Sequence, residues 1–216
     1  MKYTHIFFDL DGTVTDPYEG ITKAVSHALG KFGIEIPDRK ALSSFIGPPL
    51  YDSFRKFYGL SEEDAVLAVS YYREYYVPIG IYECEIFNGI NELLKALHES
   101  DAKIYVATSK PESMAVTVLS HFGLDKYFDG IYGATLDKSR VKKSDVIAYA
   151  LDKIGNPDPK SCIMIGDTAY DVEGARENSI DTLGVTFNGS SPEPLISAGA
   201  IGIFSKAAEL QSFLFS

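Results

Sequence analysis

The 216-residue chain is predicted to be an α/β protein with a Rossmann-like, doubly wound parallel sheet and an inserted all-helical domain. Strand-like and helix-like stretches alternate through most of the chain, which is typical of a parallel sheet covered on both faces. Residues 16–85 interrupt this alternation, because they contain no clear strand pattern. We therefore expect a core domain of residues 1–15 and 86–216 and a helical cap domain of residues 16–85.

The core strands are predicted from short apolar, β-rich runs that end at turn residues. They are expected at residues 4–9, 102–107, 130–133, 161–166, 181–186 and 201–204. Core helices are expected at residues 89–99, 111–122, 143–154, 169–178, 192–198 and 206–214. Pro111 suits a first helical turn and Gly123 suits a helix end.

The inserted domain is predicted from four helical patterns separated by Gly- and Pro-containing breaks. These helices are expected at residues 18–32, 38–45, 48–58 and 62–76. Tyr72, Tyr75 and Tyr76 share one helix face, where they either pack in the core of the cap or line a pocket. The chain is expected to cross between the domains near Thr15-Asp16-Pro17 and near residues 82–87.

The composition favours a cytoplasmic enzyme that acts on a small molecule. The chain is 45% hydrophobic, yet it has no apolar run long enough for a membrane span and no leader-like N-terminus. A net charge of −10 disfavours a nucleic-acid polymer as partner. Cys84 and Cys162 lack metal-binding spacing, so both are expected to be buried thiols. The sequence favours no particular oligomeric state.

Asp9-Leu10-Asp11-Gly12-Thr13 follows the apolar run Ile6-Phe7-Phe8. Because alternate residues of a strand point the same way, Asp9 and Asp11 can face one site. Two adjacent carboxylates repel each other unless a cation lies between them or one has a raised pKa. The motif therefore predicts chemistry, although Asp11 or Thr13 could instead cap a helix.

Two further strands also end in polar residues. Thr108 follows the run at 103–107, and Gly166-Asp167-x-x-x-Asp171 follows the run at 162–165. Ligands of open parallel sheets bind beyond the carboxyl ends of the strands. Asp9, Thr108 and Asp167 are therefore expected at one edge of the sheet.

The five residues from Asp9 resemble the nucleophile motif of the haloacid dehalogenase superfamily of phosphotransferases. Thr108, Lys143 and Gly166-Asp167-x-x-x-Asp171 are similar, in order, to the other motifs of that family, and the resemblance covers almost the whole chain. It implies a haloacid dehalogenase-like core with a helical cap. Phe45-Ile46-Gly47-Pro48-Pro49-Leu50 resembles the cap turn of the branch described as phosphoglycolate phosphatase-like or 5'-nucleotidase-like.

The resemblance implies a role for each matching residue. Asp9 would be the nucleophile and Asp11 the general acid and base. Mg²⁺ would be held by Asp9, by the backbone carbonyl of Asp11 and by Asp167, with Asp171 supporting its waters. For Asp171 the alternative is a first-turn carboxylate that complements the helix dipole.

Other residues are expected to contact the substrate or to neutralise its charge. Thr108 and the N–H of Ser109 would hold phosphoryl oxygens, and Lys143 would neutralise the charge of the phosphoryl group. Lys142 competes for that role, but Arg140-x-x-Lys143-Ser144-Asp145 matches the family pattern better. The remaining expected substrate contacts are Gly12, Thr13, Lys110 and Gly47.

The implied function is a Mg²⁺-dependent phosphatase that acts on a small phosphomonoester of the phosphoglycolate, nucleotide or sugar phosphate type. A sugar phosphomutase is the alternative enzyme, but Ile21 stands where similar mutases carry a His. Similar dehalogenases lack the second carboxylate, which is present here as Asp11. A regulatory protein that binds phosphate without turnover is the alternative from another class.

Overall fold

The computed structural model describes residues 1–137 and 139–216. The chain forms two compact units. One unit comprises Met1–Asp16 and Ile86–Ser216, and the other comprises Pro17–Glu85. That residues 16–85 act as a cap domain stays a prediction.

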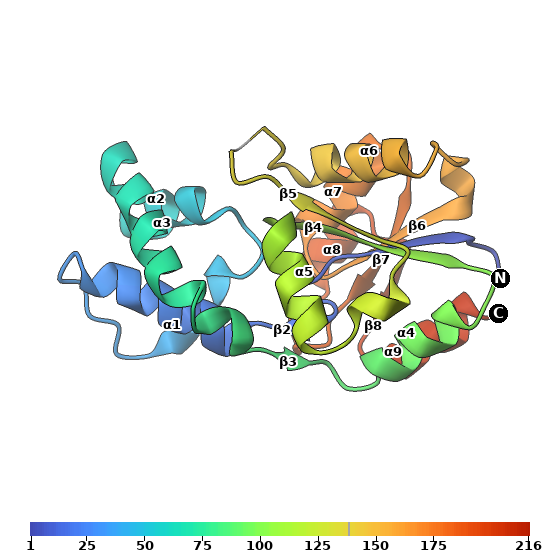
Figure 1. Ribbon diagram of the computed structural model, residues 1–216, viewed down its shortest axis with the longest axis horizontal. Coiled ribbons are helices and arrows are strands. Elements are labelled where there is room, and N and C mark those ends of the chain that lie inside the picture. The colour runs from blue at the N-terminus through green and yellow to red at the C-terminus, as the bar shows by residue number, and fades with distance from the viewer. Residues whose placement is uncertain (138) are drawn as a thin grey trace. The chain divides into compact units, whose positions relative to one another are not determined.

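The first unit is built on one six-stranded sheet (Figure 1). Its strands are β1 (His5–Phe8), β4 (Lys103–Pro111), β5 (Gly130–Ala134), β6 (Cys162–Gly166), β7 (Asp181–Val185) and β8 (Gly202–Phe204). Their order is β5-β4-β1-β6-β7-β8, and every neighbouring pair is parallel, which confirms the predicted fold class. Because the strand order reverses at β1, the carboxyl ends of β1, β4 and β6 lie together at the position where such sheets bind ligands.

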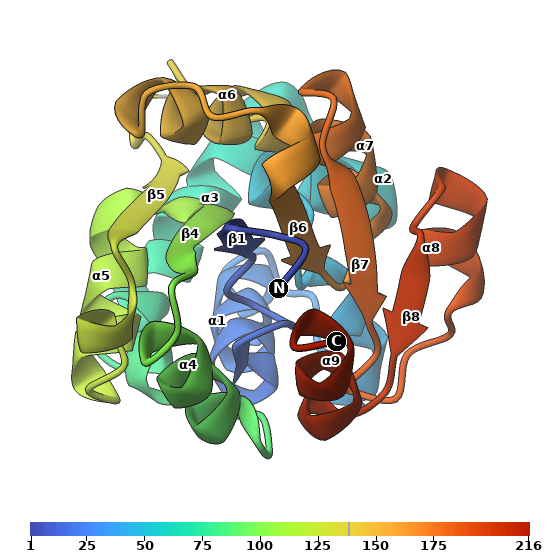
Figure 2. The same cartoon turned by 90° about the vertical axis from the view of Figure 1, so that its right-hand side faces the viewer.

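Helices cover both faces of this sheet. They are α4 (Ile90–His98), α5 (Glu112–His121), α6 (Lys143–Lys153), α7 (Ala169–Glu177), α8 (Glu193–Ala198) and α9 (Ala207–Leu214). Helices α6 and α7 lie side by side on one face, and α4 and α9 lie on the other (Figure 2). Ile6, Phe7 and Phe8 of β1 are fully buried, as expected for a central strand. In the described residues, no helix has the length and apolarity that crossing a bilayer requires.

The end of β4 differs from the prediction. The strand continues to Pro111 rather than ending at 107, and its register against β5 shifts between Thr108 and Pro111. Helix α5 therefore begins at Glu112, one residue after the predicted start. Thr108 therefore lies within β4, at the residue where the irregular pairing with β5 begins.

The shortest elements were not predicted. Strands β2 (Thr15–Asp16) and β3 (Glu85–Ile86) form a separate two-stranded sheet. Two residues are too few for an alternation of polar and apolar positions to be visible. The 3₁₀ helices η3 (Asp125–Tyr127) and η4 (Pro159–Ser161) are similarly short.

The second unit is helical. It contains α1 (Tyr18–Gly30), η1 (Arg39–Phe45), α2 (Leu50–Tyr58), α3 (Glu62–Tyr76) and η2 (Gly80–Tyr82). The segment expected as a helix at 38–45 is a 3₁₀ helix, in which the Asp38 carboxylate accepts a hydrogen bond from the N–H of Lys40. Tyr72 and Tyr76 are buried with their rings stacked 5.0 Å apart, so they pack in the core of this unit.

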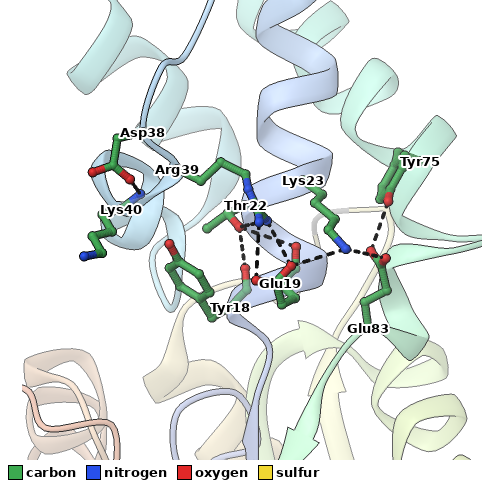
Figure 3. A network of polar contacts seen from close by, with 9 residues as sticks. All are labelled: Tyr18, Glu19, Thr22, Lys23, Asp38, Arg39, Lys40, Tyr75 and Glu83. Atoms are coloured by element: carbon green, nitrogen blue, oxygen red, sulfur yellow. Dashed lines mark hydrogen bonds and ion pairs between the residues drawn. The ribbon is translucent and has the colours of Figure 1, made fainter.

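A network of charged side chains joins α1 to other parts of the helical unit (Figure 3). Lys23 bridges the carboxylates of Glu19, at 3.2 Å, and Glu83, at 2.7 Å. Arg39 donates to Glu19 at 3.1 Å, and the Tyr75 hydroxyl donates to Glu83 at 3.1 Å. The network therefore connects α1, η1, α3 and the segment that leaves the unit.

A backbone hydrogen bond also connects α1 to the last residues of the helical unit. The N–H of Gly20 donates to the carbonyl of Glu83 at 2.9 Å. A Cβ atom on Gly20 would lie 1.9 Å from the carbonyl oxygen of Gly80, so only glycine permits this approach. The first turn of α1 is thus fixed to the last residues of the unit.

Candidate active site

Asp9 is placed at the edge of the sheet by β1 and β6. Its N–H donates to the carbonyl of Ile165 at 2.9 Å, which extends the pairing by one residue beyond β1. The side chain is buried, and its Oδ1 accepts a hydrogen bond from Lys143 Nζ at 2.7 Å. The predicted nucleophile therefore lies beside a cation at the carboxyl end of the central strand.

Lys143 is the first residue of α6, and its side chain is 4% exposed. Its Nζ lies 2.7 Å from Asp9 Oδ1, 2.7 Å from Asp171 Oδ1 and 3.0 Å from the carbonyl oxygen of Ala107. Burial lowers the pKa of Lys143, but the charges of Asp171 and Asp9 outweigh it and raise the pKa above its ordinary value. Lys142 is exposed, so Lys143 is the lysine among the carboxylates.

Asp171 is fully buried in the first turn of α7. Its Oδ2 accepts hydrogen bonds from the N–H of Thr168 at 3.0 Å and from the Thr168 hydroxyl at 2.8 Å. Thr168 was missed as a site residue, although Thr168-x-x-Asp171 is the pattern of a capping box. A Cβ atom on Gly166 would lie 2.3 Å from Asp171 Cγ, so glycine makes room for this carboxylate.

Asp167 follows β6 and is only partly exposed. Its Oδ1 accepts a hydrogen bond from the Thr13 hydroxyl at 3.3 Å. Gly12 has a φ of 90°, and a Cβ atom there would lie 2.1 Å from Asp167 Oδ2. Gly12 and Thr13 thus shape and orient the Asp167 carboxylate.

The carboxylates of Asp9, Asp167 and Asp171 lie close together, and the Lys143 ammonium balances only part of their negative charge. Oxygen atoms of Asp9, Asp167 and Asp171 lie within 4.8 Å of one another. Burial and the charges of Asp171 and Asp9 raise the pKa of Asp167 well above its ordinary value, with Lys143 opposing them. Hard oxygen donors with excess negative charge fit a divalent cation such as Mg²⁺. The residues present therefore fit a metal site.

The carboxylate of Asp11 has a different partner. Its Oδ2 lies 2.5 Å from Lys110 Nζ, and its Oδ1 is buried with no hydrogen-bond partner in the described part of the chain. The N–H of Lys110 donates to the hydroxyl oxygen of Thr108 at 3.2 Å, and Ser109 is partly exposed between them. Asp11, Thr108 and Lys110 are thus brought together. Gly47 lies between η1 and α2 with a φ of 99°, and its contact with substrate stays a prediction.

We expect Asp167→Asn to stabilise the metal-free protein at pH 7. A carboxyl whose folded pKa is raised lowers stability progressively as pH rises from the unfolded value, about 3.9, through the folded pKa. Asn removes this loss, which we expect to be on the order of 1 kcal/mol, or about 2 to 4 °C in Tm. Thermal unfolding in EDTA and in Mg²⁺ measures both conditions, and the variant should also lose the Tm gain that is expected if Mg²⁺ binds at these carboxylates.

The matched control is Asp152→Asn, which neutralises an exposed carboxylate on α6. It should leave both Tm values unchanged. If Asp167→Asn has a lower Tm than the wild type in EDTA, the inference that burial and the charges of Asp171 and Asp9 destabilise the ionised Asp167 is wrong.

Comparison with known proteins identifies relatives over most of the chain. Residues 6–185 match the family model described as haloacid dehalogenase-like hydrolase. A 5'-nucleotidase from Pseudomonas aeruginosa is 44% identical over 195 residues, which cover 90% of this chain and 88% of the relative. The crystal structure of a predicted phosphatase from Clostridium acetobutylicum is 42% identical with a TM-score of 0.95, covering 100% of this chain and 99% of the other.

A third relative is named as a kinase. The tyrosine-protein kinase PtkA of Mycobacterium tuberculosis is 39% identical over 179 residues, which cover 82% of this chain. The match spans 60% of the kinase's length.

Proposed function

We propose that the protein, which belongs to the haloacid dehalogenase-like hydrolases, is a Mg²⁺-dependent phosphatase that hydrolyses a small phosphomonoester through an aspartyl-phosphate intermediate. One observation carries the proposal. The Asp9 carboxylate is buried at the carboxyl end of the central strand, with Lys143 at 2.7 Å and two more carboxylates beside it. This arrangement suits a nucleophile that attacks a dianionic phosphoryl group.

In the first step, Asp9 attacks phosphorus. Because Lys143 contacts Oδ1, we assign the attack to Oδ2. The new O–P bond forms as the bond from phosphorus to the leaving oxygen breaks, and Asp11 gives that oxygen a proton. Thr108 and the N–H of Ser109 hold phosphoryl oxygens, while Lys143 balances their charge.

In the second step, water hydrolyses the aspartyl phosphate. Asp11, now ionised, accepts a proton from the water as its oxygen attacks phosphorus. The bond between phosphorus and Asp9 breaks, which releases inorganic phosphate and restores the Asp9 carboxylate. Lys110, 2.5 Å from Asp11, orients the carboxylate that carries this proton in both steps.

We assign Mg²⁺ to Asp9, to Asp167 and to the backbone carbonyl of Asp11. Both oxygens of Asp171 already contact Lys143 or Thr168. We therefore assign Asp171 to supporting the waters of the ion rather than to direct coordination. When bound, Mg²⁺ supplies positive charge that draws the anionic nucleophile and the phosphoryl group together. EDTA is accordingly expected to stop phosphate release, and added Mg²⁺ to restore it.

Hydrolysis is favoured over transfer to a second sugar. Ile21, at the position of the mutase His, is 5% exposed in α1 and offers no acid or base. The activities after which two relatives are named, a 5'-nucleotidase and the pyrophosphatase PpaX of Halalkalibacterium halodurans at 32% identity, support a small phosphate-containing substrate. Nucleoside 5'-monophosphates are therefore the first class to test.

The test is a phosphate-release panel in Mg²⁺. It comprises nucleoside 5'-monophosphates, phosphoglycolate, sugar phosphates, pyrophosphate and phosphotyrosine, with the Asp9→Asn protein as the control for contaminating phosphatases. We expect at least one class to be hydrolysed by the wild type alone. Mg²⁺ binding without release from any substrate would instead favour the regulatory phosphate-binding protein.

For Asp11→Asn we expect turnover to fall by about 10² to 10⁴-fold, the range typical of general acid and base catalysis. The loss should be greater for an alkyl phosphate than for 4-nitrophenyl phosphate, whose leaving group needs less protonation. Steady-state kcat for both substrates measures the difference. An equal loss for both would remove Asp11 as the acid.

A further inference from the structure

Arg140 lies in the connection between β5 and α6, and its side chain is 15% exposed. Its Nε donates to the carbonyl of Gly133 at 2.9 Å, and its Nη2 donates to Glu112 Oε2 at 3.0 Å. The guanidinium carbon lies 3.6 Å from the centroid of the Tyr149 ring. One planar group therefore contacts β5, the start of α5 and the body of α6.

Further hydrogen bonds hold the backbone around Arg140 against the residue that follows β5, and β5 against the start of α5. The N–H of Thr135 donates to the Arg140 carbonyl at 2.8 Å, and the N–H of Arg140 donates to the Thr135 hydroxyl oxygen at 3.0 Å. Glu112 Oε2 also accepts the N–H of Gly133 at 3.1 Å. A Cβ atom on Gly133 would lie 2.7 Å from the Glu112 nitrogen, so β5 and the start of α5 are in close contact.

Two of the helices that Arg140 contacts begin at or next to proposed site residues. Helix α6 begins with Lys143, three residues after Arg140. Helix α5 begins with Glu112, directly after the end of β4 that contains Thr108 and Lys110. The fork of the guanidinium and its stacking on an aromatic ring are features that a lysine cannot reproduce.

We propose that Arg140 is a positioning residue that fixes the start of α6 against the Thr108–Lys110 segment of β4, so that the Lys143 ammonium stays on the Asp9 carboxylate. The inference rests on the proposed phosphatase function for its kinetic consequence. Its structural consequence is independent of that function. Arg140 acts through Glu112, Gly133 and Tyr149 and touches no reacting atom.

The kinetic test compares Arg140→Lys with the wild type on the best substrate of the panel. The variant keeps the charge but loses the fork and the stacking, so we expect kcat to fall about 10 to 100-fold while KM changes less than about twofold. Glu112→Gln, which keeps a hydrogen-bond acceptor, should lose less. Arg176→Lys is the control, because Arg176 is an exposed residue of α7 whose Nη1 donates to the Ala198 carbonyl, and this variant should keep wild-type kcat. Equal losses in kcat and in 1/KM would overturn the positioning role.

A double-mutant cycle on thermal unfolding tests the structural part without turnover. If Arg140 acts through Lys143, the Tm loss caused by Arg140→Lys should be at least halved in the Lys143→Met background. If Lys143→Met does not fold, Asp171→Asn replaces it, since it removes one partner of Lys143. Equal Tm losses in both backgrounds would overturn the inference. If the wild type shows no phosphatase activity, only the proposed function is overturned. The double-mutant cycle does not depend on turnover, so it still tests the positioning role of Arg140.

Discussion

Asp9→Asn is expected to reduce phosphate release by about 10⁴-fold or more, because an amide at this position cannot attack phosphorus. The fold should persist, since Asn has nearly the same shape as Asp and the N–H of residue 9 still pairs with Ile165. Lys143 would retain its contact with Asp171 at 2.7 Å. The variant should therefore lose the rate of phosphate release while keeping its fold.

Three measurements on one preparation separate these effects. Phosphate release gives the rate, circular dichroism gives the fold and Tm, and equilibrium binding of inorganic phosphate gives the affinity of the site. The expected result is a lost rate with a Tm within a few degrees of the wild type. Activity near the wild-type level would end the aspartyl-phosphate mechanism.

Lys143→Met is expected to cost both stability and activity. It removes the ammonium group that lies between Asp9 and Asp171, each at 2.7 Å, and leaves two buried carboxylates facing each other. Breaking a buried ion pair by removing one partner typically costs about 3 to 5 kcal/mol. For a chain of this size, that corresponds to a Tm roughly 6 to 20 °C lower.

The loss should grow with pH, because burial raises the pKa of Asp171 and the variant lacks the Lys143 charge that lowers it, so the cost of ionising Asp171 increases as pH rises. Lys142→Met is the matched control: it removes the adjacent exposed ammonium and should leave Tm and turnover close to the wild type. Thermal unfolding of both variants between pH 5 and pH 8 measures the difference. Two variants with the same Tm would show that the burial of Lys143 has no energetic consequence.

The fold and part of the site could be predicted because they depend on local patterns. Each core strand is a short apolar run, and parallel strands bring their carboxyl ends to one edge, which predicts the neighbourhood of Asp9 and Asp167. Thr168-x-x-Asp171 was equally local and could have been recognised as a capping box.

Other contacts depend on packing that no local pattern records. The pair of Asp11 and Lys110 spans 99 positions, and the pair of Asp9 and Lys143 spans 134. Their formation requires the register of β1 on β4 and the placement of α6 on the sheet. The extension of β4 to Pro111 was missed for a related reason, because it follows a shift in pairing with β5.

The bond from the Gly20 N–H to the Glu83 carbonyl has a consequence for the order of folding. Strands β1 and β4 are neighbours in the sheet, yet residues 9–102 separate them along the chain. If the helical segment folds first, this bond brings its ends together and a shorter connection is left to close when β1 pairs with β4. Shortening the loop from about 94 residues to about 32 reduces the entropic cost of closure by about 1 kcal/mol. Early folding of residues 17–85 would thus speed the pairing of β1 with β4.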